Sequence, residues 1–132
     1  MVGLPDLMFS EKRGAARYIV SEANGTRSRE VATVKASQDL NSGQVVAFDS
    51  NGKLVPADPN ASAPQNQAVG VLYDSIDTSN GEREEVYHAR DAEVDYQELR
   101  FNGLAQADQG TLVSQLEGLG IVVRKSTQVV GF

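Results

Sequence analysis

Residues 44–58 read Gln-Val-Val-Ala-Phe-Asp-Ser-Asn-Gly-Lys-Leu-Val-Pro-Ala-Asp, and this stretch decides the fold. Two apolar runs, residues 45–48 and 53–55, flank a polar segment that ends in Asn51-Gly52. Because Gly has no Cβ and Asn tolerates the left-handed region, Asn-Gly supplies the positive φ angles of a tight turn. The pattern predicts a β-hairpin. Pro56 has no amide hydrogen to donate to a ladder, so the second strand should end there or lie at an edge.

Further strands are predicted on both sides of this hairpin. Residues 30–36 are rich in β-branched side chains. Residues 68–73 form a near-continuous apolar run in which Gly70 indicates a bulge or a close approach of another backbone. The intervening residues 58–67 hold two Pro and almost no apolar bulk, which predicts a surface loop. The remaining predicted strands are residues 18–20, residues 84–94 with a break near residues 90–91, residues 96–101 as a continuation of the sheet, and residues 121–124.

One helix is predicted over residues 108–119. Asp108 is suited to cap its first turn, because a carboxylate can accept hydrogen bonds from the exposed amides there. Leu112, Leu116 and Leu119 recur at spacings of four and three residues and form one apolar stripe. Gly120 follows at the position where a left-handed residue ends a helix.

These elements predict a mainly β fold of the β-rich α+β class. We expect a small, partly open β-barrel or sandwich with one C-terminal α-helix and an extended N-terminal arm. The arm covers residues 1–30, the β-rich domain residues 31–125, and a tail residues 126–132. The arm has little apolar periodicity, so it cannot bury enough surface to offset the entropy of ordering alone. It is either a loose tail or a segment that orders on a partner, and the sequence leaves both open.

Composition and charge exclude several classes of protein. The 132 residues include no Cys, which removes disulfides, thiol chemistry and Cys-based zinc sites. The net charge is −6, and an acidic surface disfavours nucleic acid and anionic membranes as partners. Residues 1–30 carry five basic and four acidic side chains, whereas the rest carries seven and fourteen, so arm and body differ in charge. The N-terminus lacks a secretory signal pattern and no apolar run is long enough to span a membrane, so we expect a soluble protein made in a cytoplasm.

Residues that could carry chemistry are few, and no catalytic apparatus, metal site or cofactor site is predicted. His88 is the only histidine and has no nucleophile motif beside it, so a surface or structural role is expected. Four carboxylates lie close together in the sequence, but without a calcium-loop pattern they indicate a solvated acidic rim. They are Asp91, Glu93, Asp95 and Glu98. Arg27 and Arg29, with small polar neighbours, favour a protein contact over a merely solvated loop.

Several stretches of the chain, taken in order, also carry a resemblance to a known family. The more specific ones read Ser-Glu-Ala-Asn-Gly-Thr-Arg-Ser-Arg-Glu over residues 21–30 and Arg-Asp-Ala-Glu-Val over residues 90–94. The others are residues 18–20, the hairpin region 40–57, residues 68–73 and residues 116–124. Over this span the chain resembles the head decoration proteins of tailed bacteriophages, the lambda-type family of capsid-cementing proteins.

The resemblance implies a β-rich domain with a helix that assembles as a homotrimer and is not an enzyme. It implies binding at the local three-fold axes of the expanded head, on the outer capsid surface of the virion, after synthesis in the host bacterial cytoplasm. There the trimer would clamp subunits of the major capsid protein against internal DNA pressure. The arm would order on the coat, and strand addition to an unpaired edge gives such a contact a physical basis.

From the resemblance we expect two sets of contact residues. The coat contacts are Tyr18, Ile19, Arg27 and Arg29. The trimer contacts are Val69, Val71 and Leu72, although these apolar residues could equally belong to the core.

Two other classes of function remain as hypotheses. A small ligand- or carbohydrate-binding β module on a virion or cell surface would need a cluster of exposed aromatic side chains. The eight Phe and Tyr residues are spread evenly along the chain and do not indicate one. An acid–base enzyme using Asp91 and Glu93 would need a pocket that the sequence does not indicate.

Overall fold

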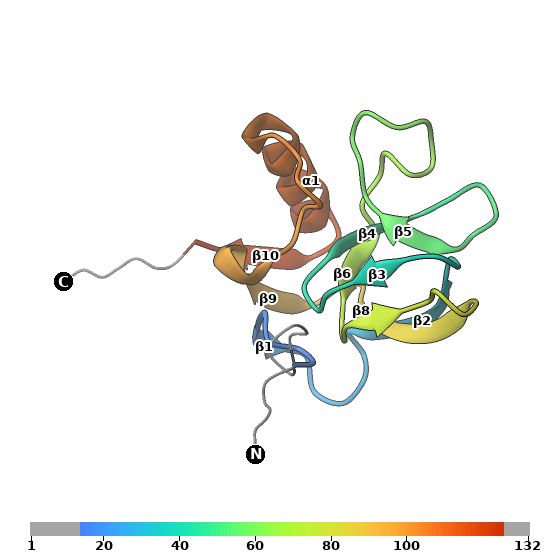
Figure 1. Ribbon diagram of the computed structural model, residues 1–132. Helices are drawn as coiled ribbons and strands as arrows, with labels where there is room; N and C mark the ends of the chain where they lie inside the picture. The colour runs from blue at the N-terminus through green and yellow to red at the C-terminus, as the bar shows by residue number, and fades with distance from the viewer. Residues whose placement is uncertain (1–13, 126–132) are drawn as a thin grey trace, which may run out of the picture.

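The computed structural model describes residues 14–125 as two sheets, a two-stranded ribbon and one α-helix (Figure 1). The elements, in chain order, are β1 (Ile19–Glu22), β2 (Arg29–Val34), β3 (Asp39–Leu40), β4 (Val45–Phe48), β5 (Leu54–Pro56), β6 (Gly70–Leu72), β7 (Ile76–Asp77), β8 (Arg83–His88), β9 (Ala92–Asp95), the 3₁₀ turn η2 (Tyr96–Glu98), α1 (Gln106–Gly118) and β10 (Ile121–Arg124).

Five strands close into a barrel in the order β2-β5-β4-β6-β8. The longest seam is the antiparallel pairing of β2 with β8, which runs from Arg29 opposite His88 to Val34 opposite Arg83. The parallel contact of β2 with β5 at Val34 and Leu54 completes the ring. The predicted mainly β fold with one C-terminal helix is confirmed, and the barrel is closed.

The predicted hairpin is confirmed as β4 and β5, and β5 ends at Pro56. Within the turn, Oδ1 of Asp49 accepts hydrogen bonds from the amides of Asn51 at 2.8 Å and Lys53 at 3.0 Å. Gly52 takes the left-handed conformation at φ +78°, whereas Asn51 does not have a positive φ. A carboxylate and one glycine therefore make this turn.

Gly70 lets β6 approach β8 closely, as its place in an apolar run predicts. A Cβ built at this position would lie 2.2 Å from the carbonyl oxygen of His88. Real Cβ atoms do not come that near to a backbone atom, so the seam between the two strands needs glycine here.

The second sheet, in the order β1-β9-β10, lies beside the barrel and carries α1 (Figure 1). β1 pairs antiparallel with β9, with a register shift between Ile19 and Ser21, and β10 pairs parallel with β9. One buried cluster joins barrel, sheet and helix, and it includes Tyr18, Val71, Val94, Leu116 and Ile121. A second cluster fills the barrel around Val34, Leu54, Leu72 and Tyr87.

Two predicted elements are corrected. The helix begins at Gln106, after Ala105 as N-cap, so Asp108 lies inside its first turn and does not cap it. Leu112 and Leu116 are buried as predicted, and Gly120 has φ +87°.

Residues 96–101 do not continue the sheet as a strand. Residues 96–98 form the 3₁₀ turn η2, because the carboxylate of Asp95 accepts a hydrogen bond from the amide of Gln97 at 2.9 Å. Arg100 alone keeps a β-bridge, with Gln44.

The part of the predicted arm that the structure describes is folded onto the body. Tyr18 is fully buried, residues 19–22 form β1, and β2 begins at Arg29. Long-range contacts with β9 and the barrel supply the burial that the local sequence lacks. Residues 1–13 and the predicted tail 126–132 lie outside the described residues.

Candidate functional site

The β1–β9–β10 sheet exposes two large apolar side chains on its outer strands. Val20 on β1 is 53% exposed and Val122 on β10 is 42% exposed. Within the described residues, β1 and β10 each pair only with β9, so each keeps one edge without a strand partner. Unpaired edge amides and carbonyls are a template for another chain. The sheet therefore offers both apolar and backbone contacts to a partner.

Between these strands, Glu93 lies in a balanced charge cluster. Its carboxylate accepts a hydrogen bond from Ser21 Oγ at 2.8 Å and forms an ion pair with Arg124. The Arg124 contact, with Ser21 second, lowers the pKa of Glu93. Across residues 14–125 no group of three or more His, Cys, Asp or Glu is arranged to hold a metal ion. Glu93 thus joins three strands of the sheet through charge and hydrogen bonding.

The two predicted coat-contact arginines lie in different environments. Arg27 is exposed, and its guanidinium has no partner within the described part of the chain. Arg29 is half-buried and binds Glu22 through two hydrogen bonds, Nε to Oε1 at 3.1 Å and Nη2 to Oε2 at 2.7 Å. Its guanidinium also lies 4.6 Å from the ring centroid of Tyr73. Arg27 is thus available to a partner, whereas Arg29 holds the loop that presents it.

Tyr18 and Ile19, the other predicted coat contacts, face inward. The Tyr18 ring has no exposed surface, and Ile19 packs half-buried against the same cluster. A surface contact by the Tyr18 side chain is therefore not available in this conformation.

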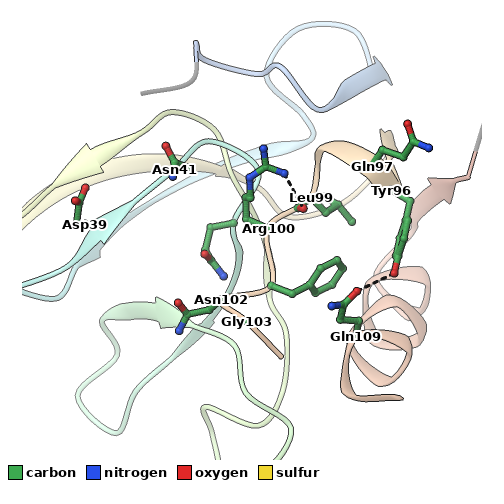
Figure 2. A pocket seen from close by; sticks show the side chains of 11 residues that line it. Asp39, Asn41, Tyr96, Gln97, Leu99, Arg100, Asn102, Gly103 and Gln109 are labelled. Carbon is green, nitrogen blue, oxygen red and sulfur yellow. Dashed lines mark hydrogen bonds between the residues drawn. The ribbon is translucent and has the colours of Figure 1, made fainter. Parts of the chain in front are cut away.

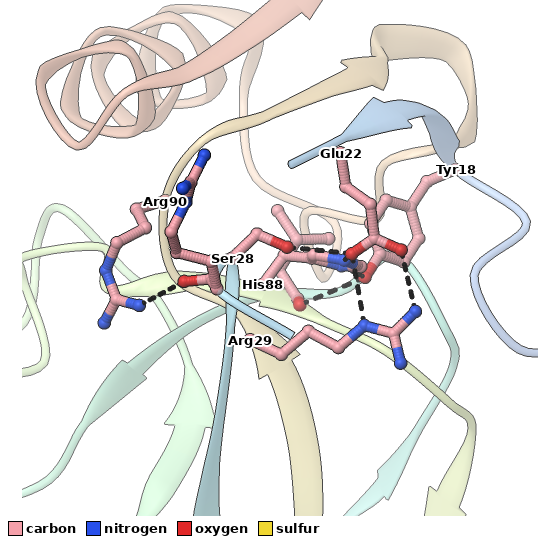
Figure 3. Close-up of polar contacts among 8 residues, drawn as sticks. Tyr18, Glu22, Ser28, Arg29, His88 and Arg90 are labelled. Atoms are coloured by element: carbon pink, nitrogen blue, oxygen red, sulfur yellow. Dashed lines mark hydrogen bonds and ion pairs between the residues drawn. The ribbon is translucent and has the colours of Figure 1, made fainter. Parts of the chain in front are cut away.

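A buried polar network connects the N-terminal segment to the barrel (Figure 3). His88, fully buried at the end of β8, has Nδ1 at 2.5 Å from the Tyr18 hydroxyl and Nε2 at 2.7 Å from Oε1 of Glu22. Ser28 Oγ donates a further hydrogen bond to the same carboxylate oxygen at 2.8 Å. Hydrogen bonding by Arg29, ahead of that by His88 and Ser28, lowers the pKa of Glu22 to about 2. The carboxylate is therefore ionised at neutral pH.

Of the two roles predicted for His88, the structural role agrees with this buried position and the surface role does not. Burial lowers its pKa, although Glu22 opposes the effect. Burial likewise raises the pKa of Tyr18 well above its usual range, so its hydroxyl keeps its proton. The network thus holds a carboxylate beside a neutral imidazole and a neutral phenol. Proton relays use the same three groups, but here neither ring has contact with solvent.

The residues predicted as trimer contacts lie inside or against the core. Val71 and Leu72 have no exposed surface, and they belong to the two different core clusters. Val69 is half-buried against the second cluster. Of the two interpretations that the sequence left open, Val71 and Leu72 fit the core.

An open polar cavity of about 480 Å³ lies where η2, the loop after it and the turn before β4 meet (Figure 2). Arg100, Gln97 and Asn102 are exposed at its rim, while Tyr96 donates a hydrogen bond to Gln109 at 2.8 Å. Asn41 lines it too, and its Oδ1 is a buried acceptor with no partner in the described chain. The cavity contains no nucleophile–base pair, so it offers binding groups rather than a reaction centre.

Sequence reasoning missed both the polar network and this cavity. His88 is separated from Glu22 by 66 residues and from Tyr18 by 70, and no local period links such positions. The usable signal was weaker: a single His beside Tyr87 at the end of a predicted strand.

No described helix is long and apolar enough to cross a membrane. No curated protein matches the chain. The family model of the bacteriophage lambda head decoration protein D matches residues 8–121, which is most of the chain and includes every strand and helix up to the start of β10. The chain therefore belongs to the family of the bacteriophage lambda head decoration protein D, a structural family whose members decorate the phage capsid.

Proposed function

We propose that this protein is a capsid cement: a homotrimer that binds the local three-fold sites of the expanded phage head and stabilises the shell against internal DNA pressure. Family membership supports capsid decoration. The partner is the major capsid protein, and the location is the outer surface of the virion. Nucleic acid and membranes are not partners in this proposal.

The observation that carries the proposal is the β1–β9–β10 sheet. It has two strand edges without partners among residues 14–125, and Val20 and Val122 are exposed on those outer strands. The predicted arm enters this sheet through β1 (Figure 1). Strand addition at such an edge gives backbone hydrogen bonds, and the valines add apolar burial.

The proposed coat contacts take into account how far each side chain is buried. Residues 1–13 are the coat-binding part of the arm, and Arg27 and the exposed Val20 contribute from the folded body. Ile19 and Arg29 act by supporting this surface. In the proposed trimer, contacts are expected from exposed residues and from the half-buried Val69, because Val71 and Leu72 are interior.

Stabilisation follows from mass action. A protein that binds the expanded shell but not the unexpanded one stabilises the expanded state in proportion to its occupancy. Three arms on one trimer raise the effective concentration of each arm, so weak single contacts give tight attachment.

The test is binding to expanded and unexpanded heads of the phage that encodes the chain. Cosedimentation should recover about three copies per local three-fold site on expanded heads, as the homotrimer requires. A variant starting at residue 14 should fold but bind weakly, whereas a variant ending at residue 125 is the control for loss of a terminus. Equal binding to both head forms, or none to either, would contradict the proposal.

Substitution of the surface valines gives a second test of the same proposal. Val20→Thr with Val122→Thr keeps β-branched side chains but replaces one methyl group in each contact with a hydroxyl group. Losing about 0.8 kcal/mol per buried methyl should weaken head binding roughly tenfold. Val31→Thr is the matched control, because Val31 is 59% exposed on the barrel strand β2.

The second candidate function is a carbohydrate-binding module, and the cavity beside Arg100 favours it. Carboxamides and a guanidinium suit hydroxyl groups, which both donate and accept hydrogen bonds. Chemical-shift changes at Gln97 and Asn102 on titration with bacterial surface oligosaccharides would support this function. If oligosaccharides leave those resonances unchanged and the protein binds heads in the separate assay, only the cement function is supported.

A further inference from the structure

His88 holds both ends of one strand. Its Nδ1 meets the hydroxyl of Tyr18, the residue before β1, and its Nε2 meets the carboxylate of Glu22, the last residue of β1 (Figure 3). The histidine itself belongs to the barrel strand β8. One fully buried side chain therefore connects the barrel to the segment through which residues 1–13 join the body.

The donors and acceptors of this contact follow from the ionised state of Glu22 together with the two contacts of the imidazole. Glu22 is ionised and can only accept, so Nε2 of His88 carries the hydrogen and donates to it. In the neutral imidazole Nδ1 is then an acceptor, and it receives the hydrogen of the Tyr18 hydroxyl. The carbonyl oxygen of Val71 lies 3.4 Å from the same hydroxyl and is a weaker alternative acceptor.

The groups around His88 come from three parts of the chain. Tyr18 and Glu22 lie at the two ends of β1, and Ser28 and Arg29 reach Glu22 from the start of β2. The Tyr73 ring, after β6, lies 5.8 Å from the imidazole between ring centroids. Glu22 is the anion and Arg29 the cation that act on His88, and their charges oppose each other. A second positive charge on the imidazole would compete with Arg29 for one carboxylate.

Outside this network, β1 is held by its pairing with β9, by the hydrogen bond from Ser21 to Glu93 and by the packing of Tyr18 and Ile19 in the core. β1 is an edge strand of four residues with a register shift in its pairing to β9. The flanking backbone bonds are Ala16 N to Tyr73 O at 2.7 Å, Asp95 N to Tyr18 O at 2.8 Å and Ala23 N to Asp91 O at 3.0 Å. Short edge elements with few backbone bonds open locally before the whole domain unfolds. The side-chain network is therefore one of the contacts that keep β1 closed, and it is the one that links β1 to β8.

We propose that His88 is a positioning residue for capsid binding: it fixes the root of the N-terminal segment on the barrel and so sets the affinity for the coat without touching it. The inference rests on the proposed cement function. When β1 is closed, the point at which residues 1–13 connect to the body is fixed. This reduces the conformational entropy lost on binding. An open β1 would also release Glu22 and thereby Arg29 and the loop that carries Arg27.

The buried position of His88 predicts that head binding depends on pH. A side chain that cannot take up a proton would not give this dependence. Closing β1 buries the imidazole in its neutral form, whereas opening returns it to water, where its proton is bound more strongly. Acid therefore favours the open form. Each unit by which burial lowers the His88 pKa reduces the ratio of closed to open β1 by up to tenfold below about pH 6.5, and the affinity falls in proportion to the closed fraction that is lost.

The experiment measures binding to expanded heads from pH 5 to pH 8 for the full chain and for His88→Gln. Gln can accept and donate hydrogen bonds but does not take up a proton. The full chain should lose affinity as the pH falls through the titration of His88, which is read directly by NMR because the chain has a single histidine. His88→Gln should bind with a flat profile. Parallel profiles for the two proteins would overturn the proposal.

A second measurement needs no variant at position 88. Hydrogen exchange of the β1 amides in the full chain should speed up between pH 8 and pH 5, after correction for the intrinsic rate, while the amides of β2 and β8 keep their protection. Tyr18→Phe, which keeps the ring but removes the hydroxyl, should show fast β1 exchange at both pH values. Exchange of β1 in step with the barrel would overturn the proposal. If the full chain binds heads at no pH, the cement function fails, whereas the exchange data still report on the network.

Discussion

Residue 70 determines how closely two barrel strands can meet. A methyl group there would lie 2.2 Å from the His88 carbonyl oxygen and 2.8 Å from Cδ2 of Tyr87. Both neighbours are buried, and the nearer atom belongs to the backbone of a paired strand. Gly70→Ala should therefore lower the free energy of unfolding by about 1–3 kcal/mol, as overpacking does in other cores. Urea denaturation measures the change.

Gly110 provides the control for that substitution. It lies in α1, and a Cβ there would meet nothing within 4 Å. Because alanine is the better helix former, Gly110→Ala should raise the free energy of unfolding by about 0.5–1 kcal/mol. Equal losses at the two positions would contradict the close-approach explanation.

Acid should destabilise the fold through two residues in separate pH windows. Glu22 has its pKa lowered from 4.5 to about 2, so its stabilising effect is complete above pH 4.5 and is lost as the pH falls toward 2. His88 has its pKa lowered by burial, so the unfolded chain takes up a proton first and stability declines below about pH 6.5. Glu22→Gln should remove the lower window and cost about 1–3 kcal/mol at pH 7. Thermal melts between pH 2 and pH 8 check this, and an unchanged acid profile in the variant would count against it.

At the scale of elements, Gln115 attaches α1 to the backbone of the loop between β5 and β6, and an exposed hydrogen bond from Asn60 to Asp108 adds a second contact. Gln115 accepts a hydrogen bond from the amide of Ala68 at 2.6 Å and donates one to the carbonyl of Asn66 at 3.1 Å. Gln115→Ala leaves both backbone groups without this partner, so a loss of about 1–3 kcal/mol is expected. The exposed neighbour Ser114→Ala should change stability by less than about 0.5 kcal/mol. Chemical denaturation of the two variants makes the comparison, and equal effects would refute the attachment.

Elements whose signals are local could be predicted from the sequence. The β4–β5 hairpin, the break between β8 and β9, and Gly120 after the helix follow from turn chemistry and periodicity. η2 could not be predicted, because the spacing of Tyr96, Leu99 and Phe101 resembles that of a strand. The strand ends at Asp95, whose carboxylate caps η2. Arg27 was found as an exposed candidate, but the burial of Tyr18 depends on a histidine 70 residues away. Distant pairings of this kind leave no local pattern.

At the scale of the whole molecule, the barrel and the β1–β9–β10 sheet share one core, and the N-terminal segment belongs to it from Tyr18 onward. A variant starting at residue 14 should therefore melt like the full chain, whereas one starting at residue 23 loses Tyr18 and β1 and leaves His88 without partners. We expect that second variant to be destabilised by about 3 kcal/mol or more, in line with loss of a large buried aromatic. Equal melting temperatures for the two truncations would show that β1 contributes nothing to the fold.

The central claim, that this protein cements the head, is tested most directly on DNA-filled heads that lack it. The temperature at which such heads release their DNA should rise when the full chain is added at saturation, since a ligand bound only to the intact expanded shell stabilises it. The variant starting at residue 14 should give a smaller rise at the same concentration. An unchanged release temperature, with the chain demonstrably bound at its sites, would contradict the claim.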